Sequence, residues 1–149
     1  MDKTRLRQVI QTRIAPPKAP KNIIARSGIE ELLSSSEGKK LLLVTAPAGY
    51  GKTTIVNDYI HHSGKTSAWV HISPDIKNVF DLIVYLISSL NRINAQFGSS
   101  ILETLSLIEN DNEKINDMSA ALREIAGLII NELLKHFDRE VLIVLDDLQ

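Results

Sequence analysis

A glycine-rich run that ends in lysine and threonine is the clearest chemical feature of this 149-residue chain. It reads Ala46-Pro47-Ala48-Gly49-Tyr50-Gly51-Lys52-Thr53-Thr54. A triphosphate is held well by backbone N–H groups at the start of a helix, together with one lysine. Gly49 and Gly51 permit the positive φ angles at which successive N–H groups point inward. We therefore predict that residues 46–54 bind the phosphates of a nucleotide.

Two side chains of this run have predicted chemical roles. Lys52 is expected to contact the β- and γ-phosphates as a catalytic residue, and the hydroxyl of Thr53 to bind Mg²⁺. Ala46 stands where the commonest form of the motif has glycine. A glycine-rich turn with no ligand is the alternative, but an apolar run before the loop and an amphipathic segment after it favour phosphate binding. Gly64-Lys65-Thr66 lacks this context and precedes a strand pattern.

Two adjacent aspartates end the last apolar run of the chain, at Asp146 and Asp147. Mg²⁺ prefers hard oxygen ligands and keeps several waters, so one or two carboxylates suffice. We predict that Asp146 holds the metal, largely through water, and that Asp147 orients or activates the attacking water as a catalytic residue. An exposed turn after an edge strand is the alternative. The phosphate loop earlier in the chain favours the metal site.

Apolar strands and amphipathic helices alternate along the chain and would position these residues. Continuous apolar runs predict buried strands at residues 41–45, 67–72 and 141–147. Helical spacing and end signals, including a capping pattern at Asn78 and Asp81, predict helices at residues 29–33, 52–63, 79–93, 101–108 and 118–137. The fold class is therefore α/β with a mainly parallel sheet. Because such a domain normally continues beyond its acidic strand, we expect residues 27–149 to be a partial nucleotide-binding domain.

Composition narrows the function further. The chain has no cysteine, which excludes disulfides and thiol chemistry and suits a cytoplasmic location. No apolar run has the length of a membrane span, and no signal peptide is apparent. Residues 1–26 hold seven basic side chains against one acid, although the whole chain has a net charge of −1. This proline-containing arm could contact nucleic acid or nucleotide phosphates, but a solvated leader is favoured.

Histidine and tryptophan offer weaker candidates. His61 and His62 are expected to be solvent-exposed at a helix end, because no second ligand pair accompanies them. His71 lies within a predicted strand and is interpreted as a satisfied core or edge histidine. Trp69 is more typical of a core than of a nucleotide stacker. No serine–histidine–acid or cysteine–histidine set is present in the sequence.

Three parts of the chain together resemble one protein family. They are residues 12–54, the strand Trp69-Val70-His71-Ile72-Ser73 with its following helix, and the ending Leu145-Asp146-Asp147-Leu148-Gln149. These are similar to the N-terminal part of the nucleotide-binding domain in large ATP-dependent LuxR-type regulators, the maltose-regulator-like members of the signal-transducing (STAND, AAA+-like) ATPases. The run from Thr45 to Thr54 is the most specific piece, because Pro47 and Tyr50 distinguish it from generic phosphate loops. Residues 94–114 carry little family signal.

The resemblance implies a molecular switch with a P-loop NTPase fold, Walker A and Walker B motifs, and ATP with Mg²⁺ as cofactors. ATP binding would drive self-association of the full-length protein, and slow hydrolysis would reset it. DNA would be bound only through a C-terminal domain outside this sequence. Ile24-Ala25-Arg26 would lie near the adenine. A further strand, expected after Gln149, would lie between the phosphate-loop strand and the Asp146 strand, and an arginine or sensor residue would follow it.

Two other functions stay open from the residues alone. A small phosphotransferase would share the phosphate loop but would need an arginine-bearing lid, for which Asp138-Arg139 is the sparse hint. A non-catalytic remnant would retain the loop without a working site. ATP is favoured over GTP because no Asn-Lys-x-Asp guanine-reading motif is present. If the chain is a fragment of a switch, we expect it to hydrolyse ATP near background rates.

Overall fold

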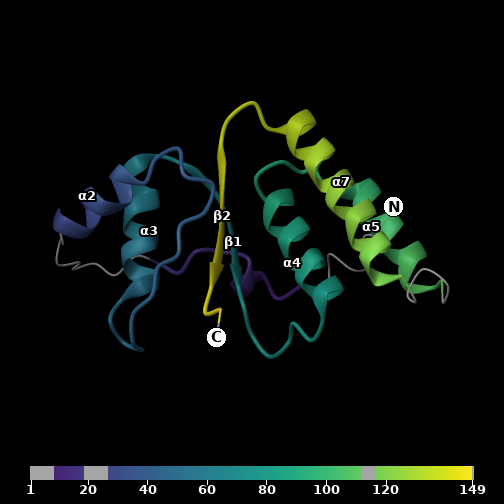
Figure 1. The fold of residues 1–149 in the computed structure, drawn as a ribbon, viewed down its shortest axis with the longest axis horizontal. Helices are drawn as coiled ribbons and strands as arrows, with labels where there is room; N and C mark the ends of the chain where they lie inside the picture. The colour runs from purple at the N-terminus through teal and green to yellow at the C-terminus, as the bar shows by residue number, and fades with distance from the viewer. Residues whose placement is uncertain (1–8, 19–26, 112–116, 149) are drawn as a thin grey trace.

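The computed structural model describes residues 9–18, 27–111 and 117–148, and two parallel strands lie at its centre. Helices lie on both sides of this pair, with α2 and α3 on one side and α4, α5 and α7 on the other (Figure 1). The helices are α2 (Ser27–Ser35), α3 (Lys52–Ser63), α4 (Val79–Asn91), α5 (Ser99–Glu109) and α7 (Met118–His136); the strands are β1 (Thr66–His71) and β2 (Val141–Asp146). The predicted α/β class is confirmed.

The two strands pair in parallel with a continuous register. Thr66 is opposite Val141 at one end, and His71 is opposite Asp146 at the other. The ladder extends one residue further, because the N–H of Ile72 donates to the carbonyl of Asp146 at 2.8 Å. This register places His71 beside the predicted metal ligand.

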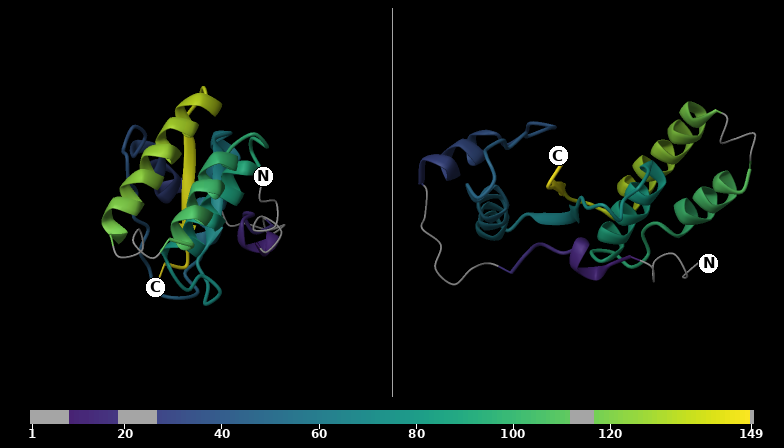
Figure 2. Two further views of the ribbon diagram at one scale, coloured as in Figure 1. Left: turned by 90° about the vertical axis from the view of Figure 1, so that its right-hand side faces the viewer. Right: turned by 90° about the horizontal axis from the view of Figure 1, so that it is seen from below.

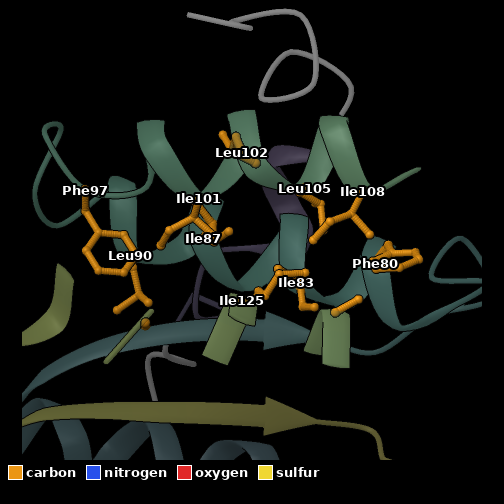
Figure 3. Packing of buried hydrophobic residues seen from close by; sticks show 12 residues of the cluster. Phe80, Ile83, Ile87, Leu90, Phe97, Ile101, Leu102, Leu105, Ile108 and Ile125 are labelled. Carbon is orange, nitrogen blue, oxygen red and sulfur yellow. The ribbon is translucent and has the colours of Figure 1, made fainter. Parts of the chain in front are cut away.

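The hydrophobic core lies between β1 and the three helices α4, α5 and α7 (Figure 3). Helix α4 begins at the predicted cap, where the side chain of Asn78 accepts a hydrogen bond from the N–H of Asp81 at 2.9 Å. Its apolar face is buried against α5 and α7. The fully buried side chains of this cluster include Ile87, Leu90, Phe97, Ile101, Leu105 and Ile108. No described helix has the length and apolar character to cross a membrane.

The predicted strand at residues 41–45 is wrong. The segment is irregular, and Leu41 and Leu43 are 84% and 75% exposed. A strand is stabilised by hydrogen bonds to a neighbouring strand. In the described part of the chain, β2 pairs with β1 alone, and the segment is separated from β2 by space rather than by a hydrogen-bonded partner. The expected burial of β2 on both faces is also wrong, since Ile143 and Leu145 are 45% and 44% exposed.

The described part of the N-terminal arm packs against the domain. Val9 and Ile14 flank a short 3₁₀ turn, η1 (Gln11–Arg13), and are buried in a second cluster with Val70 and Tyr85. For these two residues the expectation of a solvated leader is wrong. The arm then passes from the α4 side of the molecule toward α3 (Figure 2). Residues 19–26, with the predicted adenine neighbours Ile24-Ala25-Arg26, lie outside the described residues.

Candidate nucleotide-binding site

The glycine-rich loop turns directly into helix α3, as its sequence predicts. Gly49 and Gly51 have φ angles of 82° and 81°, so both adopt the left-handed conformation that glycine tolerates. The first hydrogen bond of the helix runs from the N–H of Ile55 to the carbonyl of Gly51 at 2.9 Å. The N–H groups of residues 52–54 are therefore free of intrahelical acceptors and form a positive helix end. Such an end suits an anion.

Lys52 lies across this loop rather than extending into solvent. Its ammonium donates to the carbonyl oxygens of Ala46 at 2.8 Å and Pro47 at 3.2 Å. The loop thus places one positive charge beside the free N–H groups of the helix start. Ala46, Pro47, Ala48, Gly49 and Tyr50 are all exposed, so the loop is open to a ligand.

The fold brings Thr53 and Asp146 together, although they are far apart in the sequence. The Thr53 hydroxyl donates to Oδ1 of Asp146 at 2.8 Å, across 93 positions of sequence. The contact forms because α3 starts beside the carboxyl end of β2, where Asp146 terminates the strand. The Asp146 side chain is 11% exposed. A hydroxyl and a carboxylate at this separation are hard oxygen donors of the kind that Mg²⁺ takes together with phosphate oxygens.

His71 connects the two aspartates. Its Nδ1 lies 3.5 Å from Oδ2 of Asp146, and its Nε2 lies 3.4 Å from Oδ2 of Asp147. Successive strand residues normally point to opposite faces, but Asp147 has a φ of 58°, which breaks the strand and turns its side chain toward the same imidazole. The sequence-based interpretation of His71 as a core or edge histidine missed this role. The strand register opposite Asp146 is the signal that reveals it.

A cavity of about 500 Å³ joins the loop to the acidic strand end. Its lining includes Ala46, Ala48 and Lys52 on one side and Asp146 and Asp147 on the other. Trp69 forms part of the wall and is 1% exposed, so its predicted place in the core is confirmed. The cavity is large enough for the phosphate groups of a nucleotide.

The donor set fits a metal that is shared with a ligand. Within residues 9–18, 27–111 and 117–148, no group of three or more His, Cys, Asp or Glu side chains could hold a metal ion by itself. Mg²⁺ bound to a triphosphate needs only one or two protein ligands, because phosphate oxygens and waters complete its shell. Thr53 and Asp146 would hold it, and it would neutralise charge on the phosphates.

The remaining sequence candidates lie away from this site. His61 and His62 are exposed near the end of α3, as predicted. Lys65 of Gly64-Lys65-Thr66 is 3.2 Å from Glu37 and 3.7 Å from Glu140, near the start of both strands. The hydrogen bond with Glu37 raises the pKa of Lys65. This second glycine–lysine–threonine run is therefore a helix end and an ion-pair site, remote from the phosphate loop.

Comparison with curated proteins gives relatives of two kinds. The chain is 26% identical over 138 residues to the HTH-type transcriptional regulator MalT of Vibrio parahaemolyticus, and 28% identical over 138 residues to MalT of Vibrio campbellii. It is 24% identical over 139 residues to the serine/threonine-protein kinase PknK of Mycobacterium tuberculosis. These alignments cover 93%, 93% and 91% of this chain but only 14%, 14% and 12% of the relatives.

The family comparison covers most of the chain. The NB-ARC domain matches residues 25–149, a range that holds the phosphate loop, both strands and the two aspartates. No solved structure gives a significant match. The resemblance to regulators of the MalT type is confirmed. With its phosphate loop at the start of α3 and its parallel sheet, the chain belongs to the NB-ARC family of P-loop NTPase domains.

Proposed function

We propose that this chain is the ATP- and Mg²⁺-binding switch module of a signal-transducing ATPase that regulates transcription. The hydrogen bond between Thr53 and Asp146 carries the proposal. It places a hydroxyl from the phosphate-loop helix beside a carboxylate from a strand end, and Lys52 lines the cavity of about 500 Å³ that Asp146 also lines. This is the donor chemistry that a magnesium-bound triphosphate requires.

Each residue of the site has a defined role in this proposal. Residues 46–54 supply N–H groups to the phosphates, and Lys52 exchanges its two carbonyl acceptors for phosphate oxygens. Thr53 and Asp146 hold Mg²⁺, and Asp147 orients the attacking water. His71 holds both carboxylates at the carboxyl end of the two strands. Catalysis of phosphoryl transfer depends mainly on such positioning and charge stabilisation.

The relatives support a regulatory module rather than a complete enzyme. One is named a transcriptional regulator and another a protein kinase, yet the same region of this chain aligns with both. A domain that occurs in proteins with such different activities is typical of a nucleotide-dependent switch. In a full-length regulator it would control self-association in the cytoplasm, and DNA would be bound by another domain.

A small phosphotransferase is the second candidate, and the structure gives it little support. Its sequence hint, Asp138-Arg139, precedes β2, whereas Asp146 ends that strand. Both residues are exposed and lie at the other end of the strand from the phosphate loop. An arginine lid would have to close over the phosphates, which this position does not favour.

We also infer that the sheet accepts one more strand between residues 41–45 and β2. A space of about 180 Å³ separates them and is lined by Leu42 and Val44 on one side and Leu142–Leu145 on the other. Apolar side chains face this space from both sides, as in the interior of a parallel sheet. Filling it would bury Leu42 and satisfy the free edge of β2.

The direct test is nucleotide titration of the 149-residue chain. We expect ATP to bind more tightly than GTP, and Mg²⁺ to increase the affinity. Lys52→Ala should lower ATP affinity by roughly tenfold or more, because a charged hydrogen-bond donor to phosphate is lost. Circular dichroism should show unchanged helix content in the variant. Equal ATP binding by wild type and Lys52→Ala would contradict the proposed site. If a longer chain binds ATP but does not hydrolyse it, the alternative of a non-catalytic remnant is favoured.

A further inference from the structure

The N-terminal arm crosses the site at the ends of the strands. Val9 and Ile14 anchor it in the cluster with Val70 of β1 and Tyr85 of α4. Farther along, the side-chain amide of Asn57 in α3 donates to the carbonyl of Pro17 at 2.8 Å. Asn57 is one helical turn from Thr53 and on the same face of α3. The arm is therefore held at two places, by the cluster with Val70 and Tyr85 and by the hydrogen bond from Asn57.

Two cavities lie between the arm and the predicted metal ligands. One of about 490 Å³ is lined by Thr53 and Asp146, and a neighbouring one of about 460 Å³ is lined by Asp147. Arg13 and His71 line both of them. Arg13 is therefore the basic residue of the described arm that borders the environment of both aspartates and of the Thr53 hydroxyl.

The guanidinium of Arg13 has only a weak partner within the described residues. It lies 3.9 Å from Oδ2 of Asp75, and the two side chains are 33% and 50% exposed. An ion pair this long and this exposed contributes little to stability. A phosphate group is a better acceptor, because the planar guanidinium can form two parallel hydrogen bonds with its oxygens. Arg13 can therefore leave Asp75 at little cost.

The residues proposed to hold the metal indicate which phosphate Arg13 would contact. Thr53 and Asp146 would hold Mg²⁺, which would neutralise charge on the last two phosphates of a bound triphosphate. The terminal phosphate would then lie on the Thr53–Asp146 side of the loop, which is the side that the Arg13 cavity borders. Asp146 and Asp147 line these two cavities, and Asp75 lies 3.9 Å from Arg13, so an added phosphate needs a cation beyond Lys52 and the metal.

We propose that Arg13 contacts the terminal phosphate of a bound magnesium triphosphate and so makes the N-terminal arm selective for triphosphate over diphosphate. This inference rests on the proposed function. It assigns the charge-stabilising cation to the arm that precedes the phosphate loop. The family resemblance instead implies such a residue after Gln149.

The test compares two nucleotides in the 149-residue chain by calorimetry. Probes are Mg²⁺ with the non-hydrolysable ATP analogue AMP-PNP, and Mg²⁺ with ADP. Arg13→Ala should weaken AMP-PNP binding by roughly tenfold, the effect of one lost charge-assisted contact, while ADP affinity changes by less than about twofold. Arg13→Lys should keep part of the preference, because it retains the charge but not the bidentate geometry.

Two control variants separate a phosphate contact from a structural role. Arg92→Ala removes the guanidinium whose Nη1 donates to the carbonyl of Gln11 at 3.5 Å, and so perturbs the arm without changing the cavity charge. Lys18→Ala removes the other cation that lines the larger cavity. We expect both variants to keep the wild-type ratio of AMP-PNP to ADP affinity.

Each unfavourable result has a separate meaning. An equal loss for both nucleotides in Arg13→Ala, no loss for either, or the same selective loss in Arg92→Ala or Lys18→Ala would overturn the role of Arg13. If the wild type binds both nucleotides and Lys52→Ala abolishes that binding, the phosphate loop stands even when Arg13 fails. Wild-type chain that binds neither nucleotide would overturn both the site and the role of Arg13.

Discussion

Asp146 is the residue on which the metal assignment depends. Its carboxylate accepts the Thr53 hydroxyl at 2.8 Å and lies beside His71, so two neighbours fix its position. A largely buried acceptor with fixed neighbours is already oriented when a metal arrives, which lowers the entropy cost of coordination. A neutral amide at this position would keep the shape but not the charge.

We therefore predict that Asp146→Asn weakens nucleotide binding in Mg²⁺ by roughly tenfold but changes binding in EDTA much less. The loss arises because Asn offers Mg²⁺ a neutral oxygen and can place its NH₂ group toward the metal. Parallel ATP titrations with Mg²⁺ and with EDTA measure it. Asp138→Asn is the matched control, because Asp138 is exposed before the opposite end of β2. An unchanged metal dependence in Asp146→Asn would make the acidic strand end structural.

At the scale of the elements, Glu132 positions one helix against another. It lies on α7, and its two carboxylate oxygens accept the N–H of Gly98 at 2.6 Å and the hydroxyl of Ser100 at 2.7 Å. These donors belong to the first turn of α5 and its cap, so one side chain holds α5 to α7. Partial burial raises the pKa of Glu132, but these hydrogen bonds and the nearby His136 and Lys135 outweigh it and lower the pKa below 4.5.

The lowered pKa of Glu132 leads to a prediction about the stability of the fold in acid. A carboxyl whose pKa is lower in the folded state stabilises the fold above its unfolded pKa, and this contribution is lost as pH falls through the folded value. Glu132→Gln should therefore lower the free energy of unfolding at pH 7 by about 1 kcal/mol, and the difference from wild type should shrink below pH 4.5. Thermal melting from pH 7 to pH 3 measures both, with exposed Glu31→Gln as the control. A difference that does not vary with pH would contradict the carboxylate role.

Local signals predicted the elements whose ends are coded in a few residues. Asn78 caps α4, Gly64 ends α3 with a φ of 64°, and the positive φ angles of Gly49 and Gly51 follow from the loop sequence. In each case the determining interaction spans only a few positions. The strand predicted from the apolar run at residues 41–45 is wrong, because its conformation depends on a neighbouring strand. The run itself does not encode that neighbour.

Nonlocal pairing also explains which site residues were missed. Thr53 and Asp146 could be placed from their motifs, because each follows a recognisable pattern. His71 and Arg13 have no such pattern. His71 meets both aspartates through the strand register, and Arg13 reaches the site through burial of Val9 and Ile14. These arrangements depend on tertiary packing, which the sequence of either segment leaves open.

At the scale of the whole molecule, β2 has a free edge with exposed apolar side chains. Ile143 and Leu145 are about half exposed there, and Leu42 is 49% exposed across the adjacent space. An uncovered apolar strand edge can pair with another chain. The described residues include no charge on β2 between Val141 and Leu145 that would oppose such pairing.

We predict that the 149-residue chain self-associates through this edge and that Ile143→Lys reduces the association. Lysine on an edge strand opposes pairing, because its charge would have to lie next to the incoming chain. Sedimentation velocity over a range of protein concentrations measures the effect. Leu134→Lys is the matched control, since Leu134 is 77% exposed on α7, away from the edge. Equal association of Ile143→Lys and wild type would place the contact elsewhere.

The 93 positions between Thr53 and Asp146 also set an order of events during protein synthesis. A ribosome adds about 5–20 residues per second, so the phosphate loop precedes its acidic partner by roughly 5–20 s. In that interval the emerging chain has Lys52 and the helix start but not the carboxylate that completes the metal site. Under the proposed function, tight capture of magnesium nucleotide would then coincide with docking of β2 onto β1. The bound nucleotide would thereafter stabilise the folded chain over the nascent one by mass action.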